Sequence, residues 1–234
     1  MRYLLLLLSV SAMVFASIGN IAALKGVVKI KRNTKTITAK YGLAIEEKDV
    51  VLTRKNSRVQ IILKDQTVVT IGGNSKYSFN EYRFNAKKDS KAKMKLDHGF
   101  FHVITGKIGK VAPERFKVQT KSATIGIRGT NFFASVRAKR EEIGCIRGKI
   151  SILTDRMQRF TLPAGHMASL QANRTWKSKP IPRAYKKKLE VPKAKKIPAP
   201  ATSQVQQNVL IQEESHSTPP PPTPPVLPPN CLPK

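Results

Sequence analysis

Arg128 is the residue whose neighbours most clearly suggest chemistry. It is the only charged side chain in the run 122–135, and Gly126 and Gly129 lie on either side of it. Two glycines so close together in a strand pattern indicate a turn or a close approach of backbone. A partly buried arginine there needs several acceptors, so we expect Arg128 to brace neighbouring strand ends through its five donors. The alternative for Gly126, Arg128, Gly129 and Thr130 is contact with an anionic ligand or a partner carboxylate.

Two histidines, His98 and His102, have a spacing that would suit a metal ion on a helix. The surrounding residues predict a strand, in which positions i and i+4 share a face but lie about 13 Å apart. We therefore predict structural or solvent-exposed histidines and no metal site. The sequence shows no paired-carboxylate cluster, nucleophile elbow or phosphate-binding loop, and nothing in it indicates a cofactor, so we predict no enzymatic activity.

Two cysteines, Cys145 and Cys231, leave a disulfide open as an alternative. Cys145 belongs to a strand-like run, whereas Cys231 lies three residues from the end of the sequence. We favour a small buried side chain at Cys145 and an exposed thiol at Cys231.

Short extended runs separated by turn signals fill residues 18–171 and position these side chains. Val59, Ile61 and Leu63 alternate with polar neighbours, the pattern of a half-buried strand, and no window shows a helical period of apolar residues. So many short strands predict an all-β domain. The predicted strands are 18–24, 27–31, 50–52, 58–63, 67–71, 76–82, 93–97, 100–104, 116–120, 124–127, 131–138, 142–146, 149–153, 158–162 and 166–170.

A family resemblance covers roughly residues 18–170. The segment Ile125-Gly126-Ile127-Arg128-Gly129-Thr130 resembles the most characteristic motif of the FecR domain, named for the periplasmic regulator of ferric-citrate transport. Residues 49–53 with 57–61 resemble its "D-x-I-x-T…S-x-A" segment, and further matches follow in the order of the family. The resemblance implies a β-solenoid-like or rolled sheet, with a sandwich as the alternative. It also implies a periplasmic, partner-responsive domain that is not an enzyme.

One departure from the family follows Asp65. Gln66 occupies the position where the family usually has glycine, and a tight hairpin turn prefers glycine there because of its positive φ. Either the turn is of another type, or Gln66 is strained.

The N-terminus and the charge together indicate the compartment. A short basic start is followed by a Leu-rich segment that is too short to span a membrane, so we expect a signal peptide over residues 1–16, cleaved after Ala16. Lys and Arg number 43 against 14 Asp and Glu, a net charge of +29 that favours polyanionic partners. In an exported, periplasmic protein these are an envelope protein or an anionic envelope polymer, not nucleic acid, with no transmembrane span after cleavage.

Residues 172–234 are predicted to form a basic, proline-rich, disordered tail, with 17–171 as the domain. Residues 174–196 contain ten cations and one acid, and prolines prevent a long helix there. Trp176 is the exception, since it could pack back on the domain. The predicted polyanion-binding residues of the tail are Lys186, Lys187, Lys188, Lys193, Lys195 and Lys196.

The sequence thus predicts an exported, non-catalytic FecR-type protein that binds, scaffolds or senses in the envelope. Members of the family that act as anti-sigma regulators have a cytoplasmic helical segment, a transmembrane helix and a C-terminal module that docks on a transporter. Those parts are replaced here by a signal peptide and a tail, which makes direct sigma-factor control improbable. A cell-wall enzyme and an anti-sigma-type regulator lacking its cytoplasmic part are the alternatives.

Overall fold

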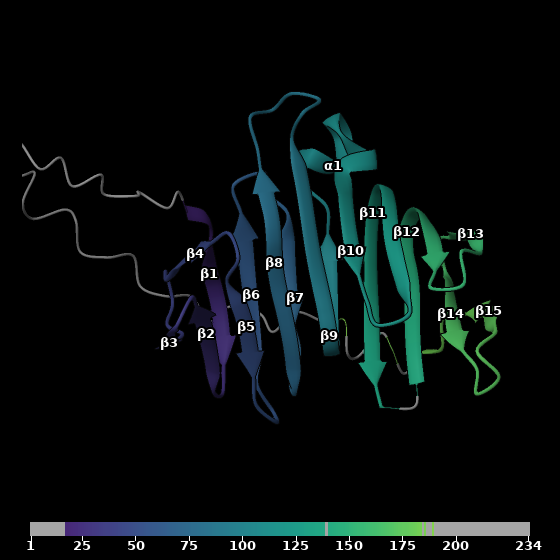
Figure 1. Cartoon of the computed structure of the whole chain (residues 1–234), viewed down its shortest axis with the longest axis horizontal. Helices are drawn as coiled ribbons and strands as arrows, with labels where there is room; N and C mark the ends of the chain where they lie inside the picture. The colour runs from purple at the N-terminus through teal and green to yellow at the C-terminus, as the bar shows by residue number, and fades with distance from the viewer. Residues whose placement is uncertain (1–16, 139, 184, 186–188, 190–234) are drawn as a thin grey trace, which may run out of the picture. The chain divides into compact units, whose positions relative to one another are not determined.

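The computed structural model describes residues 17–138, 140–183, 185 and 189. The chain divides into two units, 1–192 and 193–234, and the described residues all belong to the first. They form one 15-stranded sheet with a short α-helix and a 3₁₀ turn (Figure 1). In chain order the elements are β1 Ser17–Lys25, β2 Val28–Arg32, β3 Lys35–Thr38, β4 Ala44–Glu46, β5 Val50–Thr53, β6 Arg58–Leu63, β7 Val68–Ile71, β8 Ser75–Arg83, β9 Lys91–Ile104, α1 Ile108–Val111, η1 Pro113–Arg115, β10 Phe116–Gln119, β11 Ala123–Arg137, β12 Arg140–Thr154, β13 Arg159–Pro163, β14 His166–Leu170 and β15 Trp176–Pro180.

The sheet consists of two half-sheets that share three long strands. The first half-sheet runs β3-β2-β5-β8, then 91–98 of β9, β10, 123–128 of β11, 149–154 of β12 and β13. The second runs β4-β1-β6-β7, then 99–104 of β9, 131–137 of β11, 140–147 of β12, β14 and β15. In Figure 1 the strands follow one another from β1–β4 to β13–β15.

Each of the three shared strands bends at a glycine with positive φ. Gly99 in β9 has φ 104°, Gly129 in β11 has φ 60°, and Gly148 in β12 has φ 82°. A β-carbon on Gly148 would come within 2.4 Å of the Gly129 carbonyl oxygen, so the bends of β11 and β12 lie against each other. Only glycine adopts this backbone without strain and admits so close an approach.

The positions that belong to the apolar core change phase at these bends. In β9 they are even-numbered up to Leu96 and odd-numbered from Phe101 onward. In β11 the change is from odd to even, between Ile127 and Phe132, where the pairing with β12 is also irregular. After each bend, side chains on the other face of the strand are buried as well. A slip of one residue turns every following side chain to the other face. The bend reverses which face of the strand is directed at the core, and the slip of one residue compensates for this reversal. The apolar side chains after the bend therefore face the same core as those before it.

The core lies between the two half-sheets. Tyr77 of β8 and Phe101 in the second half of β9 pack with ring centroids 5.5 Å apart, and Phe101 meets Phe132 of β11 at 5.6 Å. All three rings are completely buried. The all-β prediction is confirmed. The sheet continues through its bends, so it is the rolled sheet rather than two separate sheets of a sandwich.

The strand predictions differ from the structure in two ways. The pairs 93–97 with 100–104, 124–127 with 131–138, and 142–146 with 149–153 are three continuous strands, because each glycine bends its strand without ending it. Strands β3, β4 and β15 were not predicted. They lie at edges of the sheet and carry few buried apolar residues, so their alternation is weak.

Strand β15 moves the end of the sheet beyond the predicted boundary at Gln171. It pairs with β14 from Leu170–Trp176 to His166–Pro180, and Trp176 packs against Phe160 with ring centroids 6.3 Å apart. The start of the tail at residue 172 is therefore corrected. The predicted signal peptide and the tail lysines lie outside the described residues. Within the described part of the chain, no helix is long and apolar enough to cross a membrane.

Candidate anion-binding groove

The outer surface of the first half-sheet carries a hollow over β10–β13. Ile125 and Ile127 point into the core, so alternation turns Gly126 and Arg128 outward on β11. Gly126 pairs laterally with Lys117 of β10 and Ser151 of β12, and Arg128 pairs with Lys149. The cross-strand register, rather than sequence proximity, thus brings these residues together.

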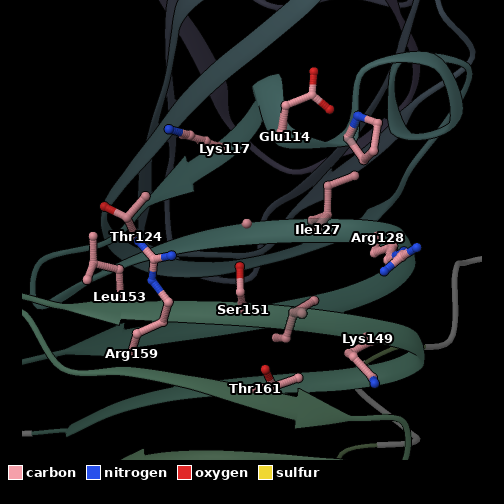
Figure 2. Close-up of a pocket in the computed structure, with 13 residues that line it drawn as sticks. Glu114, Lys117, Thr124, Ile127, Arg128, Lys149, Ser151, Leu153, Arg159 and Thr161 are labelled. Carbon is pink, nitrogen blue, oxygen red and sulfur yellow. The ribbon is translucent and has the colours of Figure 1, made fainter.

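The hollow has a volume of about 510 Å³ and is shown in Figure 2. In that view Ser151 lies near the centre, Arg128 and Lys149 on one side, and Arg159 on the other. Gly126 leaves room on its floor, since a β-carbon there would come within 2.6 Å of Ser151 Oγ. The lining residues are Pro113, Glu114, Lys117, Thr124, Gly126, Ile127, Arg128, Lys149, Ile150, Ser151, Leu153, Arg159 and Thr161.

Four cations line this groove without compensating acids. Lys117, Arg128, Lys149 and Arg159 are all exposed. Within the described part of the chain none of the four makes an ion pair or a side-chain hydrogen bond. The single acid of the lining, Glu114, lies 4.0 Å from Arg115 Nε. A concave surface with several unpaired cations concentrates positive potential and attracts anions.

The predicted brace role of Arg128 is wrong. The side chain is exposed and bonds to no carbonyl or carboxylate among the described residues. The alternation that buries Ile125 and Ile127 places Arg128 on the outer surface, just before the bend at Gly129. Its glycine neighbours therefore serve the bend and the groove floor instead of a buried guanidinium.

Thr130 is the buried, structural member of the motif. Its backbone N–H donates to Thr105 Oγ1 at 2.9 Å, and its carbonyl accepts from Thr105 Oγ1 and Thr105 N, both at 3.0 Å. These bonds fix the bend of β11 to the end of β9. The motif thus combines a rigid corner with an exposed arginine at the rim of the groove.

The family comparison is consistent with this motif. Residues 49–151 match the model of the family described as FecR protein, a stretch that contains Asp49, the Gly126–Thr130 motif and Ser151. Residues 49–151 are therefore assigned to a FecR domain. A comparison with curated proteins gives no match.

Solved structures show a more distant likeness to the chain. Two crystal structures of "a putative anti-sigma factor" from Parabacteroides distasonis ATCC 8503 align at 14% and 13% identity, each with a TM-score of 0.47. Each alignment covers 56% of this chain and 59% of the other. The chain thus spans less than two thirds of the length of those proteins.

The arginine that braces the strands is Arg32, which precedes the matched residues and was not among the predicted site residues. Its Nε and Nη2 donate to the two oxygens of Asp49 at 2.8 and 2.6 Å, its Nη1 to Glu46 at 2.5 Å, and its Nη2 also to the Ala44 carbonyl at 2.8 Å. Asp49 is fully buried, and its hydrogen bonds raise the pKa of Arg32. Asp49 is the first residue of the segment that matches the family, and this position was the one sequence feature that could have indicated a buried carboxylate. Nothing local marked Arg32 as its partner.

A second buried carboxylate of the FecR domain, Asp65, ties the β6–β7 turn to α1. It accepts from Thr67 Oγ1 at 2.7 Å, Tyr82 Oη at 3.0 Å and Ile108 N at 3.2 Å. Gln66 has φ 67°, so the side chain that replaces the usual glycine occupies a strained, left-handed backbone. Of the two alternatives for this turn, strain at Gln66 is therefore correct.

The remaining residues singled out in the sequence are the two histidines and the cysteines. His98 is exposed and His102 is buried, on opposite sides of the bend at Gly99, and the described residues contain no cluster of three or more metal-ligating side chains. Burial lowers the pKa of His102, which is hydrogen-bonded to Asn131 Oδ1 at 2.6 Å. Among the described residues Cys145 is a free, fully buried thiol, and burial raises its pKa to about 11. Cys231 lies outside the described residues.

Proposed function

We propose that this chain is an exported, non-catalytic FecR-domain protein of the periplasm that binds an anionic partner of the cell envelope. The observation that carries the proposal is the groove over β10–β13, where Lys117, Arg128, Lys149 and Arg159 have no acidic partners among the described residues. Leaving four cations unpaired in one hollow raises the local potential without a gain in folding stability. Such an arrangement is explained by a ligand that supplies the missing negative charge.

Export is supported by the position of the first strand. Ser17, the first described residue, already belongs to β1 and pairs with Glu46 of β4, directly after the expected cleavage site at Ala16. Cleavage there would leave the FecR sheet intact. N-terminal sequencing of the mature protein is expected to give Ser17 as the first residue. A protein that retains Met1 in the membrane fraction would contradict export.

The tail is proposed as a second, less selective contact with the same envelope. Its lysines add long-range attraction to any anionic surface, whereas the groove has a fixed arrangement of charges. The tail-neutral variant used below replaces six lysines by glutamine: Lys186, Lys187, Lys188, Lys193, Lys195 and Lys196.

The test compares two double variants of equal charge in the full-length protein. Arg128→Ala with Lys149→Ala removes two groove cations, whereas Lys91→Ala with Lys93→Ala removes two lysines of β9 that are paired with Glu81. At about 0.1 M salt we expect the groove variant to bind isolated envelopes about tenfold more weakly and the control variant at most about twofold more weakly. Equal losses in the two variants would show that net charge, not the groove, determines binding.

A further inference from the structure

The groove floor is a row of residues that crosses four strands. Lys117, Gly126, Ser151 and Thr161 are lateral neighbours on β10, β11, β12 and β13. Three strand spacings make this row about 14 Å long. The floor is therefore long enough for an extended ligand that lies across the strands.

Cations border this row on both sides. Arg128 and Lys149 form the next row toward the bend at Gly129. On the opposite side Arg159 pairs laterally with Leu153, which pairs with Thr124. These two rows are four residues apart along β11, or about 13 Å. Cations thus lie along both edges of the floor, an arrangement that fits a ligand with repeated anionic groups.

The floor between the cations presents hydroxyls and lacks aromatic side chains. Ser151 and Thr161 carry exposed hydroxyls, and hydroxyls both donate and accept hydrogen bonds. No Phe, Tyr or Trp lines the groove, which disfavours a nucleic-acid strand that would stack its bases. Ile127 and Ile150 are buried beneath the floor and Leu153 is half-buried, and carbon atoms supply most of the exposed lining surface. A sugar ring, which has both hydroxyls and C–H faces, complements such a floor.

We propose that the groove binds a strand of acidic polysaccharide that lies across β10–β13. The anionic groups of successive sugars contact Arg128 and Lys149 on one side and Arg159 on the other. The sugar hydroxyls bond to Ser151 and Thr161, and the missing side chain at Gly126 admits a ring close to the sheet. This assignment rests on the proposed function and names the chemical class of its anionic partner.

The experiment uses the full-length, tail-neutral variant, so that binding reports on the groove. The probes are polygalacturonate, its fully methyl-esterified form, polyphosphate and poly-L-glutamate, measured by calorimetry at equal ionic strength. We expect polygalacturonate to bind at least about tenfold more tightly than the other three, and Arg128→Ala or Arg159→Ala each to weaken it about fivefold. Ser151→Ala with Thr161→Ala should weaken polygalacturonate about tenfold and polyphosphate much less, because sugar hydroxyls both donate and accept hydrogen bonds whereas phosphate oxygens only accept them.

A further variant tests whether the shape of the groove floor matters, and two outcomes would contradict the proposal. Gly126→Val adds a side chain to the floor at a position without positive φ, and it should abolish polygalacturonate binding while the protein stays folded. Equal binding of polyphosphate or poly-L-glutamate, with no effect of the hydroxyl variants, would overturn the polysaccharide and leave the proposed function standing. Unchanged binding of every probe by the Arg128 and Arg159 variants would overturn both.

Discussion

Two cationic regions of the same half-sheet differ in whether their cations are paired with acids. On β8 and β9, Lys91 and Lys93 both lie 2.7 Å from the oxygens of Glu81, and these lysines lower the pKa of Glu81 to about 2. Asp97 in the same region pairs with two further lysines, Lys76 at 3.0 Å and Lys95 at 2.9 Å. Over β10–β13 the four groove cations have no such partners among the described residues.

Under the proposed function, pairing rather than charge density separates a solvated surface from a binding surface. Exposed pairs contribute little to stability, but they cancel the potential that would attract an anion. The groove keeps its potential and is concave as well. In a chain with a net charge of +29, counting cations alone could not have located it.

The largest expected effect tests whether pairing also distinguishes structural arginines. Arg32→Ala leaves the fully buried Asp49 carboxylate without its guanidinium and should cost about 3 kcal/mol of unfolding free energy. Arg128→Ala, which removes an exposed side chain, should cost less than about 0.5 kcal/mol. Urea unfolding of both variants measures this. If Arg128→Ala lowered the free energy of unfolding as much as Arg32→Ala does, Arg128 would be a structural brace after all.

The next prediction separates long-range attraction from the groove. The tail-neutral variant should bind isolated envelopes at least about thirtyfold more weakly than the natural chain, since each cation near an anionic surface contributes about 1 kcal/mol. The loss should exceed that of the Arg128→Ala and Lys149→Ala double variant. Both should shrink as salt is raised, because the Debye length falls to about 3 Å at 1 M. Salt-independent binding, or no loss in the tail-neutral variant, would show that the tail does not contribute.

A smaller effect follows from converting the paired region into an unpaired one. Glu81→Gln releases Lys91 and Lys93 without creating a hollow. We expect binding to isolated envelopes to rise only about twofold, with little change in the free energy of unfolding. A gain as large as the loss caused by removing Arg128 and Lys149 would mean that the shape of the groove is unimportant.

The smallest expected effect is on thermal stability and concerns Glu141, a buried acid that has no cationic partner among the described residues. Glu141 is buried, its Oε1 has no hydrogen-bond partner among the described residues, and burial raises its pKa above 4.5. Because the pKa of Glu141 is higher in the folded state than in the unfolded state, its protonated form contributes to the stability of the fold. That contribution is fully present below pH 4.5 and is lost as the pH rises through the pKa of the folded state. Glu141→Gln should therefore raise the melting temperature at about pH 8 and change it little at about pH 4. Melting curves at both values decide; an equal change at both would contradict the raised pKa.

The sequence by itself determined the class of fold and the family. Alternation of apolar residues depends only on the period of a strand, so β1, β6 and β14 were predicted almost to the residue. The motif around Arg128 carried the family resemblance, which the match over residues 49–151 confirms. Its glycines also marked the places where the alternation changes phase.

Only the tertiary structure decided what those glycines and Arg128 do. Whether a glycine ends a strand or bends it depends on the partner strand, and Gly129 and Gly148 bend together because β11 and β12 are paired on both sides. The groove is assembled laterally from β10, β11, β12 and β13, and local sequence does not encode this register. The partner of Asp49 could not be recognised from sequence for the same reason. Arg32 lies 17 residues away and meets Asp49 only where β2 pairs with β5.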